Sequence, residues 1–254
     1  MTEPVPRDGA GVAGGGGLAG ATAAALRRRL RGRDASSTPV ERVVRRYAGS
    51  GRIAQGYVRS KLLRDPVHAA VLALAAAEPF GDVLDLGCGR GQLGIALLET
   101  GLARSVRGVD RADRPLAQAR LAGAGLAFTV EHADLAVASP SGLAFAAIDT
   151  ALLVDVLYQL DPAAQVRLLE RVAVAASRRV VIRTLDPSRG WRSAVTLGFE
   201  QASRFVSPHS GAHVRPTPLD RLVAPLQRAG FATEVAPCWR GTPFANVLLL
   251  ARRD

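Results

Sequence analysis

The chain has 254 residues, 48% of them hydrophobic, and a formal net charge of +11 at pH 7. A chain of this length can bury a full core, which predicts one large domain with or without an appendage. It has no run of about 18 uncharged apolar residues, which excludes a transmembrane helix, and its N-terminus lacks the features of a secretory signal. Cys88 and Cys238 are too few for a disulfide framework or a cysteine-rich zinc site. We therefore expect a reduced cytoplasmic protein without a bound metal.

The positive charge is concentrated near the N-terminus. Residues 1–60 contain eleven arginines and four acidic residues, a net charge of +7, so the remaining 194 residues carry only +4. Lys61 is the only lysine. This preference for arginine, together with the many Ala and Gly residues, is more typical of a GC-rich coding bias than of phosphate binding, which makes nucleic acid the less favoured partner.

Composition and helix signals divide the chain into three segments. Residues 1–38 are predicted to form a flexible leader rich in Gly, Ala and Arg. Residues 39–78 are predicted to form an N-terminal helical cap, with a helix over Val40–Tyr47 and further helix on both sides of Asp65-Pro66, where proline disfavours helical backbone in the residue before it. Residues 79–254 are predicted to form the main domain, which contains the ligand site.

The main domain alternates between short apolar runs and helical patterns, which is typical of a parallel sheet covered by helices on both faces. The runs predict strands over Val83–Leu86, Val106–Val109, Ala127–Glu131, Ile148–Val154, Val180–Thr184, Phe231–Ala236 and Val247–Ala251. The helical patterns cover Gln92–Glu99, Pro115–Leu121, Pro162–Ala176 and Pro218–Ala229. The predicted fold class is therefore α/β, a doubly wound and mostly parallel sheet of seven strands.

Residues 187–217 interrupt this alternation between the fifth strand and the last helix. A structureless loop of this length is unusual inside a compact domain. We therefore expect the insertion to carry a helix over Trp191–Phe205 and to lie over the acceptor site.

The most informative motif is Val83-Leu84-Asp85-Leu86-Gly87-Cys88-Gly89-Arg90-Gly91, in which a buried strand ends at an acidic residue and a glycine-rich turn leads into a helix. Parallel sheets bind ligands at the carboxyl ends of their strands, and glycines let the backbone approach a ligand closely. The spacing of Gly89, Gly91 and Gly94 also fits a dinucleotide fingerprint. In that case the Asp85 carboxylate would repel the pyrophosphate, whereas it attracts an ammonium group. S-adenosylmethionine, which has both an α-amino group and a ribose, therefore fits better than NAD.

Two further carboxylates follow the second and third strands. Asp110 lies 19 residues after Gly91, where an acidic side chain can accept hydrogen bonds from both ribose hydroxyls. Because NAD needs the same group, Asp110 indicates an adenosine ligand without choosing between the two. Asp134 is placed to accept a hydrogen bond from the adenine amine, with Leu135 along the ring, although Asp also commonly caps the loop after a strand.

Together with Asp110, Ala133-Asp134 and the segment AIDTALLVDVLYQLDP, this motif makes residues 57–254 resemble the class I S-adenosylmethionine-dependent methyltransferases. The resemblance implies an antiparallel seventh strand and a cofactor site on the ends of the first four strands. The site residues that it implies are Asp85, Gly87 and Gly89 at the methionine part, Asp110 at the ribose, Asp134 and Leu135 at the adenine, and Asp155 and Leu157 after the fourth strand, with Arg111 as a further cofactor-binding residue.

The upstream segment Tyr57-Val58-Arg59-Ser60-Lys61 resembles, more loosely, small bacterial methyltransferases of pigment and polyketide-like natural products. Tyr57 and Lys61 lie four residues apart, on one face of a helix. With Arg59 they are candidates for holding the carboxylate of the cofactor or of an anionic substrate, and the alternative is a solvated helix face. The segment favours a role in natural-product biosynthesis.

The catalytic residues are harder to predict. Methyl transfer from a sulfonium is an in-line displacement, which requires alignment and exclusion of water, and a protonated nucleophile also requires a general base. His209 and His213 titrate in the useful range, and Tyr158 follows the fourth strand, so these three are the candidates. An ordinary surface position is the alternative for both histidines.

We therefore expect a cytoplasmic S-adenosylmethionine-dependent methyltransferase that acts on a small molecule, such as a natural-product intermediate with an aromatic hydroxyl or a carboxylate. An RNA methyltransferase is the alternative that the basic leader suggests, but the sequence contains no Asn-Pro-Pro-Tyr-like motif and no recognisable RNA-binding module. A nicotinamide-dependent oxidoreductase or a non-catalytic nucleotide-binding module is the alternative of another class. For the oligomeric state, a homodimer is kept as an alternative to a monomer.

Overall fold

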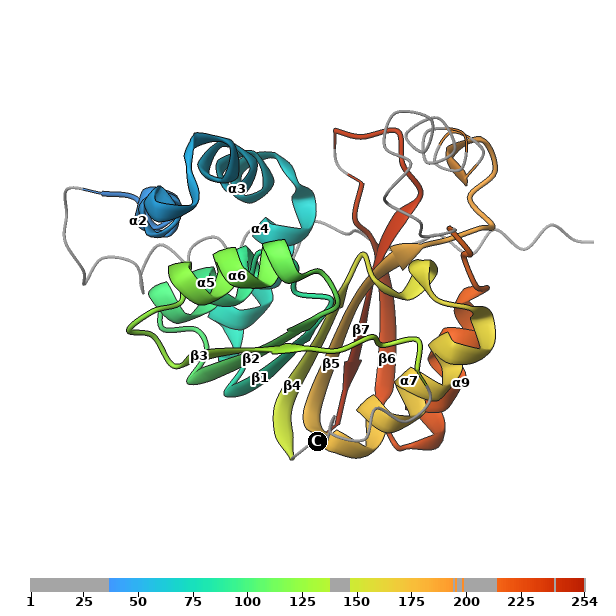
Figure 1. Ribbon diagram of the computed structural model, residues 1–254. Helices are drawn as coiled ribbons and strands as arrows, with labels where there is room; N and C mark the ends of the chain where they lie inside the picture. The colour runs from blue at the N-terminus through green and yellow to red at the C-terminus, as the bar shows by residue number, and fades with distance from the viewer. Residues whose placement is uncertain are drawn as a thin grey trace, which may run out of the picture.

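The computed structural model describes residues 37–137, 147–193, 195, 198, 214–239 and 241–253. Within these residues seven strands form one sheet (Figure 1). The strands are β1 (Asp82–Leu86), β2 (Ser105–Asp110), β3 (Phe128–His132), β4 (Ile148–Val154), β5 (Ala176–Leu185), β6 (Ala232–Pro237) and β7 (Asn246–Arg252). Their order is β3-β2-β1-β4-β5-β7-β6, with parallel pairs from β3 to β5 and with β7 antiparallel to both of its neighbours. The predicted α/β fold and its antiparallel last strand are confirmed.

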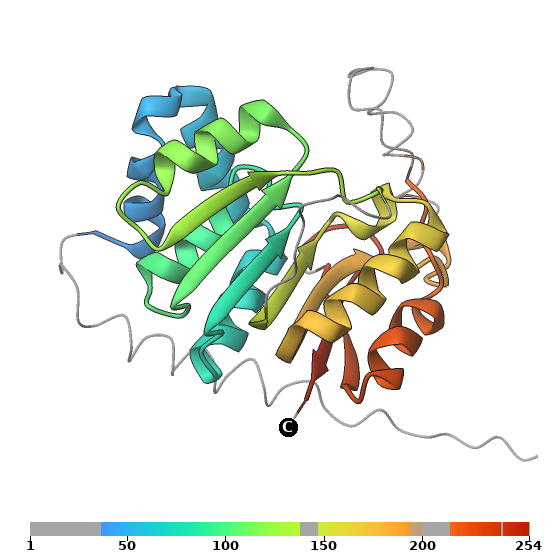
Figure 2. The same cartoon turned by 60° about the horizontal axis from the view of Figure 1, so that its bottom comes forward.

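Helices cover both faces of the sheet. They are α2 (Pro39–Arg46), η2 (Ala48–Ser50), α3 (Arg52–Arg64), α4 (Pro66–Ala77), α5 (Gln92–Glu99), α6 (Asp113–Ala122), η3 (Leu157–Gln159), α7 (Pro162–Ala175) and α9 (Leu219–Arg228). Helices α7 and α9 lie beside the half of the sheet with β5 and β6, and α4, α5 and α6 lie beside the half with β1–β3 (Figures 1 and 2). None of the described helices has the length and apolar character needed to cross a bilayer. The helix expected over Trp191–Phe205 lies mostly outside the described residues.

Side-chain alternation along β1 divides the core into two layers. Leu84 and Leu86 pack on the side of α7 and α9, whereas Val83 packs on the side of α4 and α5, because successive side chains of a strand point to opposite faces. Burial of a large apolar side chain contributes about 1.5–3 kcal/mol. The two layers therefore hold the carboxyl ends of the central strands in fixed positions, and these ends carry the polar residues of the site.

Strand β5 begins earlier than the sequence pattern predicts. It follows the last residue of α7, Ala175, directly and starts four residues before the predicted Val180. Its first residues are mostly polar, so a search for apolar runs does not detect them. The arginines among them form ion pairs. Arg178 and Arg179 both form ion pairs with Glu78, which follows α4. Backbone pairing with β4 and β7 thus continues over this polar part, and the ion pairs balance its charges.

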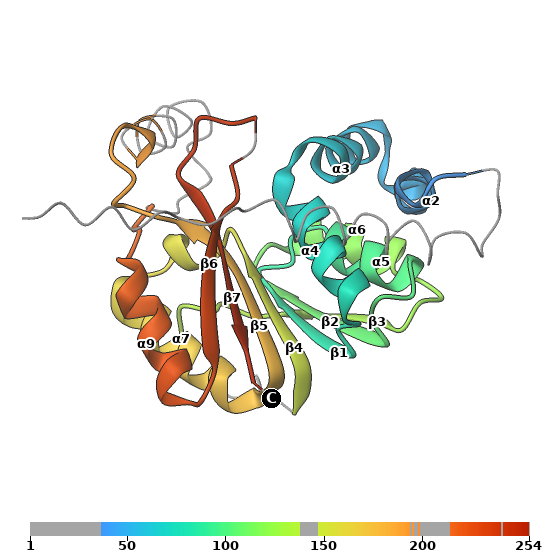
Figure 3. The same ribbon diagram turned by 180° about the vertical axis from the view of Figure 1, so that it is seen from behind.

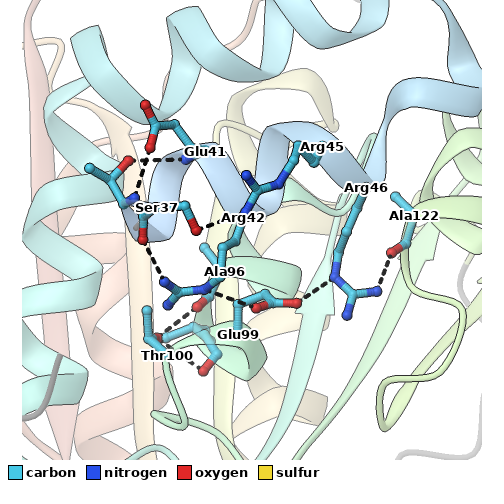
Figure 4. A network of polar contacts seen from close by, with 11 residues as sticks. Ser37, Glu41, Arg42, Arg45, Arg46, Ala96, Glu99, Thr100 and Ala122 are labelled. Atoms are coloured by element: carbon cyan, nitrogen blue, oxygen red, sulfur yellow. Dashed lines mark hydrogen bonds and ion pairs between the residues drawn. The ribbon is translucent and has the colours of Figure 1, made fainter. Parts of the chain in front are cut away.

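Helices α2 and α3 form a layer on the outer side of α5 and α6 (Figures 1 and 3). A capping box of Thr38 and Glu41 begins α2. Arg42 and Arg46 then form ion pairs with Glu99 at the end of α5, and Arg46 also donates to the carbonyl oxygen of the last residue of α6 (Figure 4). This network joins α2 to α5 and α6 of the main domain.

Replacing Glu99 by glutamine is expected to lower the free energy of unfolding by about 1–2 kcal/mol, because Glu99 is largely buried and pairs with two arginines. Glu170→Gln is the matched control, since Glu170 forms one exposed ion pair with Arg228 and should change stability by about 0.5 kcal/mol or less. Urea unfolding measures both variants. Equal effects of the two substitutions would show that the network does not hold α2 in place.

Candidate functional site

Glycines with left-handed backbone shape the loop between β1 and α5. Gly87, Gly89 and Gly91 have φ values of +77°, +56° and +73°, a region that residues with a Cβ rarely adopt. The N–H of Gly87 donates to the carbonyl oxygen of Val109 at 2.7 Å, and the N–H of Gly91 donates to that of Cys88 at 2.9 Å. The first bond fixes the loop against the end of β2, and the second closes a turn within the loop. A Cβ on Gly89 would have no atom within 4 Å, so this part of the loop faces open space.

Asp110 links the glycine loop to the end of β2. Its Oδ2 accepts a hydrogen bond from the N–H of Gly89 at 2.8 Å, and its Oδ1 accepts one from the N–H of Ala112 at 2.9 Å. A carboxylate has about four lone-pair sites, so two remain for a ligand. Asp110 therefore holds the loop and still has the capacity to bind the two hydroxyls of a ribose.

Asp85 is buried at the end of β1, where only 3% of its surface is exposed. Burial, and to a lesser extent the nearby charge of Asp110, raises the pKa of Asp85 to about 7. Among the described residues no cation forms an ion pair with Asp85. A ligand that brings an ammonium group would supply that cation, so the site suits an amino acid ligand better than a diphosphate.

The residues after β2 and β3 lie at the next part of the same edge. Arg111 has an exposed side chain, and its carbonyl oxygen lies 2.8 Å from Nε2 of His132. The Oδ1 of Asp134 accepts a hydrogen bond from the N–H of Ala136 at 2.9 Å, which is the capping role that we weighed as its alternative. Leu135 packs against the core. Binding of adenine by Asp134 and Leu135 stays a prediction.

Asp155 and Leu157 follow β4 in very different environments. Asp155 has φ +58° and accepts a hydrogen bond from Nη1 of Arg183 at 3.0 Å. Leu157 is fully buried in the core beside α7. A side chain without exposed surface cannot line an open ligand site, so the structure does not support the expected cofactor contact of Leu157.

A cavity of about 340 Å³ lies where β4 and β5 end. Since β7 is antiparallel, its first residue, Asn246, pairs with Leu185 and lies at the same edge. The cavity is therefore lined by residues that follow β4, by the end of β5 and by the start of β7. The junction of α3 and α4 completes it. Its lining consists of Ser60, Lys61, Arg64, Asp65, Pro66, Asp155, Tyr158, Arg183, Leu185, Thr242, Phe244 and Asn246.

Four charged side chains form a chain of ion pairs along this cavity. Lys61 pairs with Asp65 at 2.9 Å, Asp65 pairs with Arg183 at 2.7 Å, and Arg183 pairs with Asp155 at 3.0 Å. Burial by itself would raise the pKa of both carboxyl groups, of Asp65 and of Asp155. For Asp65 the charges of Arg183 and Lys61 outweigh burial, so its pKa is lowered, whereas for Asp155 burial dominates and its pKa is raised.

The three residues predicted to hold a carboxylate are placed differently from one another. Lys61 lines the cavity. The guanidinium carbon of Arg90 lies 4.2 Å from the centroid of the Tyr57 ring. Tyr57 therefore borders the glycine loop. Arg59 is exposed and is not part of the cavity lining. Of these three residues, only Lys61 is thus placed to contact a molecule in the cavity.

The candidate catalytic residues are only partly covered. Tyr158 lines the cavity, whereas His209 and His213 lie outside the described residues. Sequence reasoning missed Arg183 and Asp65 as site residues. A signal for Arg183 existed, because it is a charged residue in the middle of the apolar segment Val180–Thr184, and a buried charge requires a partner.

Alanine substitutions at two loop glycines should separate folding from ligand binding. A Cβ on Gly87 would lie 2.6 Å from Cγ2 of Val156, so Gly87→Ala is expected to lower the free energy of unfolding by about 2–3 kcal/mol. Gly89→Ala adds backbone strain of about 1 kcal/mol but no clash. Its Cβ would fill the space above the loop and weaken S-adenosylmethionine binding about tenfold or more. Urea unfolding and calorimetric titration measure the two effects, and a more severe fold defect in Gly89→Ala would contradict the prediction.

Comparison with protein families matches residues 83–177 to a family described as a methyltransferase domain. The match begins in β1 and ends in β5, so it contains the glycine loop, Asp110 and Asp155. No curated protein matches this chain in sequence.

Several solved structures share the fold. Magnesium protoporphyrin IX methyltransferase from Synechocystis PCC 6803, with bound S-adenosylhomocysteine, has a TM-score of 0.56 at 22% identity, over 84% of this chain and 93% of that one. An O-methyltransferase family protein from Burkholderia thailandensis has a TM-score of 0.58 at 18% identity, over 78% and 57% of the two chains. A small RNA methyltransferase has a TM-score of 0.54 at 16% identity, over 74% and 25%. At these identities the likeness shows the fold and does not choose the acceptor.

Proposed function

We propose that this chain is an S-adenosylmethionine-dependent methyltransferase that methylates a small molecule with an aromatic hydroxyl or a carboxylate, bound in the cavity at the ends of β4 and β5. The observation that carries the proposal is the position of this cavity. It lies at the same sheet edge as the glycine loop and Asp85, and its lining includes Asp155, which directly follows β4, the strand next to β1. A donor on the loop and an acceptor in the cavity would thus meet at the end of β4.

Each residue of the predicted cofactor site has a role in this proposal. Asp85 binds the ammonium group of the donor, and the lone pairs of Asp110 that its two backbone bonds leave unused bind the ribose. Gly89 lets the backbone come close, and Asp134 accepts a hydrogen bond from the adenine. When bound, S-adenosylmethionine supplies an electrophilic methyl group on a sulfonium. The protein aligns this methyl group with the acceptor and excludes water from both.

The size and the lining of the cavity support a small acceptor. Its volume of about 340 Å³ is within the range of small-ligand sites, about 300–1,000 Å³. Leu185 and Phe244 provide apolar contact, and Arg64 provides an exposed positive charge at the mouth. This combination suits a planar apolar molecule with one polar or anionic group.

The test combines binding and turnover. Calorimetric titration with S-adenosylmethionine is expected to show saturable binding at one site, and incubation with methyl-labelled donor is expected to label members of a panel of phenols and aromatic carboxylic acids. The same assay with RNA, for the full chain and for a variant without residues 1–38, tests the rival acceptor. Labelling of RNA alone, lost with the leader, would overturn the small-molecule proposal, and the absence of saturable binding would overturn the cofactor site.

A further inference from the structure

Asp155 has a backbone conformation that needs explanation. Among the described residues it is the only non-glycine residue with positive φ, +58°. It lies where β4 turns into η3, and its N–H donates to the carbonyl oxygen of Arg183 at 3.2 Å. Strained conformations of this kind cost about 1–3 kcal/mol and are found preferentially at functional sites. Here the turn places the Asp155 side chain in the lining of the cavity.

The carboxylate of Asp155 has unused acceptor capacity. Its Oδ2 accepts a hydrogen bond from Nη1 of Arg183 at 3.0 Å. Its Oδ1 is buried and accepts no hydrogen bond of normal geometry from the described residues, although the Tyr158 side chain lies near enough to the carboxylate to lower its pKa. Buried polar atoms are nearly always satisfied, so an orphan oxygen in a cavity wall indicates a partner that arrives with the ligand.

Charged and titratable groups face Asp155 from each element around it. Arg183 comes from β5, Asp65 from the junction of α3 and α4, Lys61 from α3, and Tyr158 from η3. Burial is the largest effect and raises the pKa of Asp155, and the charge of Asp65 adds to it, while Arg183, Lys61 and Tyr158 oppose it. A carboxylate with a raised pKa is a stronger base than an exposed one.

We propose that Asp155 is the general base of methyl transfer, and that its carboxylate takes the proton of a hydroxyl group on the acceptor in the cavity. The inference rests on the proposed function and narrows its acceptor to a hydroxyl compound. The acceptor oxygen forms a bond to the methyl carbon while the bond from that carbon to sulfur breaks, and the bonding electron pair stays on sulfur. The proton passes to Asp155 and then to solvent. Arg183 is a positioning residue, since it holds the carboxylate through Oδ2.

The proposal excludes a carboxylic acid as the main acceptor. A carboxylate is already ionised at neutral pH and needs no base. A phenol is protonated at neutral pH and gains from a base by about 10²- to 10⁴-fold. Dependence of the rate on the acidity of the acceptor is therefore the property that identifies the role of Asp155.

The test compares wild type with Asp155→Asn, because asparagine also tolerates the left-handed backbone and keeps the shape of the side chain. Both proteins are assayed with phenol and with para-nitrophenol, which ionises near neutral pH. We expect unchanged S-adenosylmethionine affinity, a loss of at least 100-fold in kcat with phenol, and a loss of less than tenfold with para-nitrophenol. The limb of the wild-type pH–rate profile that reports the base should be absent in the variant. Asp113→Asn, which makes the same chemical change at an exposed carboxylate outside the cavity, is the control and should keep that limb.

Other results have distinct meanings. Equal losses with both phenols would show a structural role and overturn the proposal. Weaker S-adenosylmethionine binding by the variant would place Asp155 at the cofactor instead. Wild-type turnover of aromatic carboxylic acids but of no phenol would overturn the proposal and leave the proposed function intact. Failure of the wild type to bind S-adenosylmethionine would reject the proposed function itself.

Discussion

Replacing Asp85 by asparagine is expected to weaken S-adenosylmethionine binding about 10- to 100-fold at pH 8 and to stabilise the ligand-free protein at the same pH. A hydrogen bond to a charged group contributes about 1.5–3 kcal/mol, which corresponds to this range of affinity. The stabilisation has the opposite sign because no cation pairs with Asp85 in the described part of the ligand-free chain, so its ionised form has lost hydration without compensation. Titration calorimetry and urea unfolding measure the two effects.

The stability effect should depend on pH. The pKa of Asp85 is about 7 in the folded protein, well above its ordinary value of 3.8. The stability that comes from the raised pKa is fully present below pH 3.8, where the unfolded chain is also protonated, and it is lost as the pH rises from there to about 7. At pH 5 the wild type has lost only part of it, so the advantage of the variant should be smaller at pH 5 than at pH 8, where the variant should be more stable by on the order of 2 kcal/mol or more.

Asp113→Asn is the control, because the Asp113 side chain is exposed at the start of α6 and should change stability by at most about 0.5 kcal/mol at either pH. The affinity of wild type for S-adenosylmethionine should also fall below pH 7, by up to tenfold per pH unit, since ligand binding requires the ionised carboxylate. The variant should lack this dependence. A gain of stability that is the same at pH 5 and pH 8 would show that desolvation of the charge is not its cause.

The placement of the proposed cofactor residues could be predicted because these residues are local in sequence. Asp85 and the glycines lie within one strand-loop-helix unit, and Asp110 follows the next strand, so alternation of apolar runs places them at one edge of the sheet. The structure adds the bond from Gly89 to Asp110, which no spacing rule specifies. The strand bounds were predictable where the pattern is apolar, and the prediction failed at the start of β5, where backbone pairing continues over polar residues.

The acceptor side was not predictable from one sequence. Asp65 and Arg183 are 118 positions apart, and their contact depends on how α4 packs against the sheet. The Asp65-Pro66 pair signals only the start of a helix, and it does so correctly, since Asp65 caps α4 through the N–H of Val67. That the same carboxylate also forms a buried ion pair is a property of tertiary packing, which a local pattern does not encode.

Arg183 should contribute more to stability than any other charged residue of the cavity. Only 6% of its side chain is exposed, and it pairs with both Asp65 and Asp155. Replacing it by methionine, which has a similar length and no charge, leaves two carboxyl groups in the cavity wall without their shared cation. Breaking a buried ion pair in this way costs about 3–5 kcal/mol. We expect a loss of this size in the free energy of unfolding at pH 8.

The loss should be smaller at pH 5 than at pH 8. Without Arg183 the folded-state pKa of both carboxyl groups rises above its value in the wild type, so each group contributes stability only at low pH, where it is protonated, and loses it as the pH rises. Adding Asp155→Asn to the variant should restore part of the stability at pH 8, because Asp155 has no other ion pair among the described residues, whereas Asp65 keeps its ion pair with Lys61. This rescue distinguishes electrostatic loss from a packing defect, which no change of charge would repair.

Arg178→Met is the matched control on the same strand. Arg178 is half exposed and pairs with the equally exposed Glu78, so its replacement should lower the free energy of unfolding by about 1 kcal/mol or less. Urea unfolding at pH 5 and pH 8 measures all of these variants. A loss in Arg183→Met that is no larger than in Arg178→Met would mean that solvent reaches the cavity wall and screens the carboxylates. In that case the raised pKa of Asp155, and with it the basis for treating this carboxylate as a strong base, would also be lost.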